Sequence, residues 1–155
     1  MRKDRITDYA TAAFKDYAKY GATSRELASK LYSRAALTAA EHIGVEAPKN
    51  NVGAAIAAAE KTTEECAPLL ADMEAVERTF EHLKNKGHII DAVKAVYMAE
   101  PFQPLSQREI GRRVINFAVN YPADVRTVYK WLKQARQLFA FYRGLNVLEM
   151  GNRQR

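Results

Sequence analysis

The spacing of the apolar residues constrains this chain most, because these residues recur three or four positions apart along most of its length. Such spacing gathers apolar side chains on one side of an α-helix, whereas a half-buried strand alternates apolar and polar residues. We find no convincing segment with a period of two. The sequence therefore predicts an all-α fold, a helical bundle whose apolar faces share a core.

Capping residues and helix breakers set the expected boundaries. Gly21 ends the first helix, and Thr23 with Glu26 forms a capping box that begins the second. A proline, two asparagines and a glycine mark 45–53 as the main loop. The predicted helices cover approximately residues 6–20, 23–43, 54–60, 68–84, 89–97, 107–120 and 125–143.

The fourth of these helices carries a narrow apolar seam, with spacings of four and three. We interpret the seam as packing within the domain, and a dimer contact is the alternative. Its members are Leu69, Met73, Val76, Phe80 and Leu83.

The last two helices have the layout of a helix-turn-helix. Ser106 and Glu109 form a capping box, the Tyr121-Pro122-Ala123 segment breaks the helix, and Asp124 is a good N-cap for the final helix. One side of that helix is apolar, through Val125, Val128, Leu132, Ala135, Phe139 and Tyr142. The opposite side carries Arg126, Lys130, Lys133 and Gln137, with Thr127 and Gln134 at its edge. Arginine and lysine can bind guanine, and glutamine can pair with adenine, in the major groove.

The charge distribution agrees with this interpretation. Residues 105–155 hold 10 Lys/Arg and 3 Asp/Glu, whereas residues 1–104 hold 14 and 15, so the net charge of +6 comes from the last third. Basicity confined to one segment indicates a surface for a polyanion, and a solvated helical surface is the alternative. On the 107–120 helix, phosphate or base contacts are expected from Gln107, Arg108, Arg112 and Arg113. Ile115 and Val119 project from the arginine side, and we expect them to pack against N-terminal helices or, alternatively, a partner.

Three segments resemble phage-encoded late-gene transcription activators of the RinA/ArpU type, which are similar to region 4 of bacterial sigma factors. They are DAVKAVY (91–97), LSQREI (105–110) and RTVYKWLKQAR (126–136), within a match over about 72–145. The resemblance implies that the 125–143 helix reads DNA through Arg126, Thr127, Lys130 and Lys133. One departure concerns spacing: seventeen positions separate Ile110 from Thr127, where a compact helix-turn-helix has about ten.

These observations predict an N-terminal packing or partner unit (1–104), a DNA-binding unit (105–145) and a tail (146–155). The expected function is sequence-specific transcriptional regulation, with double-stranded DNA, RNA polymerase and a second copy as candidate partners. One alternative is a phage packaging accessory of the small-terminase kind. Another is a helical protein-interaction module that binds no nucleic acid.

Other classes of function lack support in the sequence. The single cysteine, Cys66, forms no internal disulfide, and no long apolar segment or signal peptide occurs, so we expect a cytoplasmic protein without membrane contact. The histidines lack zinc spacing, and no phosphate loop or nucleophile motif occurs. We therefore expect no metal, no cofactor and no enzymatic activity.

Overall fold

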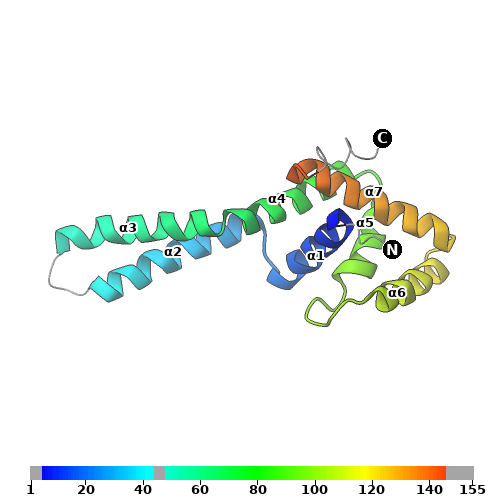
Figure 1. Cartoon of the computed structure of the whole chain (residues 1–155), viewed down its shortest axis with the longest axis horizontal. Helices are drawn as coiled ribbons and strands as arrows, with labels where there is room; N and C mark the ends of the chain where they lie inside the picture. Colours follow the sequence, from blue (N-terminus) through cyan, green and yellow to red (C-terminus); the bar gives the residue numbers. More distant parts are fainter. Residues whose placement is uncertain (1–4, 44–47, 146–155) are drawn as a thin grey trace. The chain divides into compact units, whose positions relative to one another are not determined.

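The computed structural model describes residues 5–43 and 48–145, and in these ranges every regular element is a helix (Figure 1). The predicted all-α class is confirmed. None of the described helices combines the length and apolar content that crossing a membrane requires. The elements are α1 (Arg5–Tyr20), α2 (Ser24–Ile43), α3 (Pro48–Glu65), α4 (Ala67–His82), α5 (Gly87–Val93), the π-helix η1 (Lys94–Met98), α6 (Gln107–Asn120) and α7 (Val125–Arg143).

The chain packs as two units that differ from the predicted division at residue 104. Of the described residues, the first unit combines 5–21 with 74–145, and the second combines 22–43 with 48–73. The N-terminal helix α1 therefore shares a core with the basic C-terminal helices, although 86 residues separate the end of α1 from the start of α6. The tail predicted for 146–155 lies outside the described residues.

Phe14 of α1 lies at the centre of the first unit. Its fully buried ring is 5.7 Å from that of Phe139 on α7, and 6.0 Å from those of Phe80 on α4 and Tyr97 on η1. Helix α7 packs against α1, α5 and α6, so it is supported from several sides. Val76 and Leu83 of the apolar seam lie in this same core, as packing within the domain predicts.

The second unit contains α2 and α3, which run side by side (Figure 1). The Thr23 hydroxyl accepts a hydrogen bond of 3.1 Å from the backbone N–H of Glu26, which confirms the predicted cap. The loop predicted for 45–53 is wrong from Pro48 onward, since one helix runs from Pro48 to Glu65. Proline suits a first helical turn, and the alanines that follow favour a helix strongly enough to include Gly53.

Candidate nucleic-acid interface

Helices α6 and α7 begin at the positions that their capping residues predict. The Ser106 hydroxyl accepts a hydrogen bond of 3.1 Å from the Glu109 N–H at the start of α6. Gly144 ends α7 in the left-handed conformation, with φ of 79°. Asp124 occupies the N-cap position of α7 with an extended backbone, but its side chain makes no capping hydrogen bond. The Asp124 carboxylate is therefore not used to hold the helix start.

The long spacing from Ile110 to Thr127 is accommodated by a long α6, and the turn between α6 and α7 stays short. Helix α6 continues to Asn120 and α7 begins at Val125, so four residues connect them. The two helices diverge from this turn (Figure 1). The extra residues therefore lie in the last turns of α6.

The inner face of α7 is the apolar face that the sequence predicts. Its central residues are buried and belong to the core of the first unit, while Val125 and Tyr142 at its ends are half-buried. Burial of this face fixes which way the other side of the helix points. The buried residues of the predicted face are Val128, Leu132, Ala135 and Phe139.

The outer face of α7 carries a row of exposed cations. Arg126, Lys130 and Lys133 are exposed, and none of them forms an ion pair or hydrogen bond with another described residue. Gln137 is exposed on the same side, whereas Thr127 and Gln134 are half-buried. Because α7 contains no carboxylate at all, the positive charge of this row is not neutralised within the helix. We call Arg126, Lys130, Lys133 and Gln137 the α7 row.

On α6, the arginines differ in how they are held. Gln107 and Arg108 are exposed, and Arg108 forms no ion pair with another described residue. Arg112 is also exposed, and two of its nitrogens, Nε and Nη2, donate to the Glu109 carboxylate at 3.0 and 2.5 Å. Hydrogen bonds from Arg112 and Arg113 lower the pKa of Glu109 from 4.5 to about 2, and the Glu109 carboxylate raises the pKa of Arg112.

Arg113 does not take the expected place on the surface. Only 9% of its side chain is exposed. Its Nη1 donates to the backbone oxygens of Val96 at 3.0 Å and Ala99 at 2.9 Å, and its Nε donates to Glu109 at 3.1 Å. Arg113 therefore caps the C-terminal end of η1 and connects it to α6. The sequence predicts that Arg113 contacts phosphate, and the structure corrects this to a structural role.

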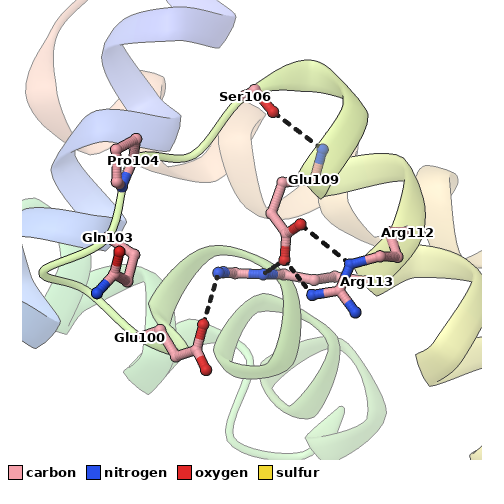
Figure 2. A pocket seen from close by; sticks show the side chains of 7 residues that line it. All are labelled: Glu100, Gln103, Pro104, Ser106, Glu109, Arg112 and Arg113. Atoms are coloured by element: carbon pink, nitrogen blue, oxygen red, sulfur yellow. Dashed lines mark hydrogen bonds and ion pairs between the residues drawn. The ribbon is translucent and has the colours of Figure 1, made fainter.

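An open hollow of about 590 Å³ lies beside this arginine (Figure 2). Glu100 reaches Arg113 from the opposite side, with an ion-pair distance of 3.7 Å. The two carboxylates and two arginines that line the hollow pair with one another. The hollow is therefore the outer side of an ion-pair cluster that fastens the 99–106 loop to α6. Its lining residues are Glu100, Gln103, Pro104, Ser106, Glu109, Arg112 and Arg113.

Several apolar residues near the interface are exposed. Ile115 and Val119 retain 54% and 76% of their accessible surface, so the expectation that they pack against N-terminal helices is wrong. Tyr129 and Phe141 of α7 are also exposed. The exposure of Tyr129 was not expected from the sequence. The only local indication is that Tyr129 directly precedes Lys130, a residue of the α7 row. Trp131 turns inward instead, with its ring 4.7 Å from that of His88.

No family model, curated protein or solved structure matches this chain. The resemblance to RinA/ArpU-type activators thus stays a prediction from the motifs. Among the described residues, no three His, Cys, Asp or Glu side chains gather where they could hold a metal ion.

Proposed function

We propose that this chain is a sequence-specific DNA-binding protein that regulates transcription, with α7 as the helix that enters the major groove. The observation that carries the proposal is the α7 row, whose three cations face solvent without a counter-ion in the described residues. An arrangement of this kind suits a polyanion, because each Lys or Arg that meets a phosphate releases a condensed counter-ion.

The shape of the site favours a duplex as the polyanion. The major groove of B-DNA is about 12 Å wide and admits one α-helix. Helix α7 has 19 residues and is anchored along its length by its buried inner face. A helix held in this way can present side chains to base edges in a fixed orientation, which sequence-specific recognition requires. Arg126 lies nearest the N-terminal end of the row, where helix-turn-helix proteins contact bases.

Helix α6 supplies cations of a second kind. Arg108 and Arg112 are exposed and lie four residues apart, on one side of the helix. Contacts from this side to phosphates would fix the register of the protein without reading sequence. Because Glu109 partly neutralises Arg112, Arg108 is the stronger phosphate ligand of the two.

The assignment to transcription rests on the RinA/ArpU-type resemblance of residues 126–136, which include most of the α7 row. Selection of duplexes from a random pool provides a direct test of sequence specificity. We expect enrichment of one sequence, and a promoter carrying it upstream should change its output when the protein is present. A pool without enrichment would contradict regulation through a specific site.

The role of α7 is tested with a triple variant, Arg126→Ala/Lys130→Ala/Lys133→Ala, in fluorescence anisotropy with a labelled duplex. Loss of one base-reading contact costs about 1–3 kcal/mol, so the triple variant should bind at least tenfold more weakly. Lys61→Ala is the control, because Lys61 is an exposed lysine of α3 in the second unit. Equal binding by the triple variant and the control would contradict the proposal.

A further inference from the structure

Two buried side chains lie in the described part of the second unit. Among the side chains that the structure describes in the second unit, Ala59 and Met73 are buried, and only Ala59 belongs to the hairpin. The two helices have 20 and 18 residues. Helices in proteins derive most of their stability from the packing of an apolar face. The exposed apolar side chains of α2 and α3 are therefore available for such packing.

One side of α2 combines cations with an exposed leucine. Lys30, Arg34 and Leu37 are spaced by four and three residues, so they lie on one side of the helix. All three are exposed, and Leu37 retains 66% of its accessible surface. We call these residues the α2 stripe.

One side of α3 combines carboxylates with an exposed isoleucine. Ile56, Glu60 and Glu64 follow one another at intervals of four residues, and all three are exposed, Ile56 at 42%. We call them the α3 stripe. Among the described residues, no ion pair or hydrogen bond neutralises the charged members of either stripe.

The two stripes also match in height along the hairpin. Leu37 lies six residues before Ile43, the end of α2, and Ile56 lies eight residues after Pro48, the start of α3. Lys30 and Glu60 lie thirteen and twelve residues from the same two ends. The rise of an α-helix is about 1.5 Å per residue. Each residue of the α2 stripe therefore lies within about one helical turn, along the hairpin axis, of an apolar or oppositely charged residue of the α3 stripe.

We propose that copies of this chain associate through the hairpin, with the α2 stripe of one copy against the α3 stripe of the next and the hairpins pointing the same way. Leu37 would then pack on Ile56, while Lys30 and Arg34 meet Glu60 and Glu64. The fitting partner is a second copy because one chain carries both complementary stripes. The contact joins two different surfaces, so it closes into a ring when its rotation allows. This inference does not depend on DNA binding.

Light scattering coupled to size-exclusion chromatography measures the mass of the full chain directly. We expect a multiple of 17.5 kDa at micromolar concentration, and Leu37→Ser should lower the mass toward that of a single copy. A wild-type mass of 17.5 kDa at every concentration tested would overturn the proposal.

Charge reversal identifies the surface. Lys30→Glu/Arg34→Glu makes both stripes acidic, and Glu60→Lys/Glu64→Lys makes both basic, so each variant should dissociate. Mixing the two variants places an acidic α2 stripe against a basic α3 stripe, and association should return. Return on mixing also shows that neither variant is misfolded.

Lys86→Glu is the control, because Lys86 is exposed in the first unit and should leave the mass unchanged. An oligomer that survives both double reversals would overturn the assignment to the stripes. Dissociation of both variants without return on mixing would also overturn it.

Discussion

Arg136 of α7 donates a hydrogen bond of 2.6 Å from its Nη1 to the hydroxyl of Tyr97 on η1. Tyr97 is only 2% exposed, so this bond lies at the edge of the core of the first unit. Arg136 is thus a cation of α7 that holds the helix in place, while those of the α7 row face solvent. Together with the buried apolar face, the bond holds α7 in the orientation that directs the row toward solvent.

Replacing Tyr97 with phenylalanine should lower the free energy of unfolding by about 1–3 kcal/mol, since the guanidinium loses its acceptor in a partly buried place. Urea denaturation measures the change. Tyr129→Phe is the control, because Tyr129 is exposed and its change should stay within about 0.5 kcal/mol. Equal effects of the two substitutions would show that the Arg136–Tyr97 bond contributes nothing.

Arg108→Ala and Arg113→Ala should separate a DNA-contacting arginine from a structural one. Loss of Arg113 leaves the Val96 and Ala99 carbonyls without their charged donor, so the free energy of unfolding should fall by roughly 1.5–3 kcal/mol.

Arg108→Ala should change the free energy of unfolding by less than about 0.5 kcal/mol relative to wild type. It should also lower the slope of log affinity against log salt by about the value of one phosphate contact. Urea denaturation and anisotropy report the two properties. The reverse pattern would contradict the assignment of these arginines.

Stability should depend on the charge of Glu109 in acid. Its pKa in the folded protein is about 2, below the ordinary value of 4.5. The contribution of the carboxylate is therefore complete above about pH 4.5 and is lost as the pH falls from there toward 2. Glu109→Gln should show a smaller fall in Tm over this interval than the wild type. Parallel Tm curves would mean that the Arg112 and Arg113 contacts do not stabilise the fold.

Two glycine-to-alanine substitutions should act in opposite directions. Gly144 has φ of 79°, a region that alanine rarely adopts, so Gly144→Ala should cost about 1 kcal/mol. Gly111 lies inside α6, and an added Cβ would meet only the Tyr129 hydroxyl at 3.7 Å, an ordinary contact. Gly111→Ala should stabilise by up to about 1 kcal/mol, since alanine favours the helix. Thermal unfolding compares the two, and a Gly144→Ala variant as stable as wild type would contradict the left-handed cap.

Local signals in the sequence were sufficient for the two helices of the candidate site. The Ser106 cap, the Pro122 break and Gly144 set helix boundaries within a few residues of themselves. The period of the apolar residues in α7 predicts which face of the helix is buried. The same reasoning failed at Pro48, where turn-forming residues begin α3 because the alanines that follow favour a helix.

The course of Arg113 and the packing of α1 could not be predicted from local patterns. Sequence position places Arg113 beside the exposed Arg112. Its inward direction depends on the carbonyls of Val96 and Ala99, which lie seventeen and fourteen residues away in sequence. Likewise, α1 packs in the C-terminal core across a long sequence separation that no helical period reveals. Exposure of Ile115 and Val119 depends on which helices lie nearby, which is also a property of the packed molecule.

The salt dependence of DNA binding is the first property to measure, because it reports how many phosphates the protein contacts. Anisotropy of a labelled generic duplex, titrated with wild-type protein from low to near-physiological salt, should give an affinity whose logarithm falls linearly with the logarithm of salt concentration. The slope should be about 0.9 per phosphate neutralised, and steep enough for several contacts from α6 and α7. Absence of binding even at low salt would contradict DNA binding through α6 and α7 and leave the α7 row as a solvated surface.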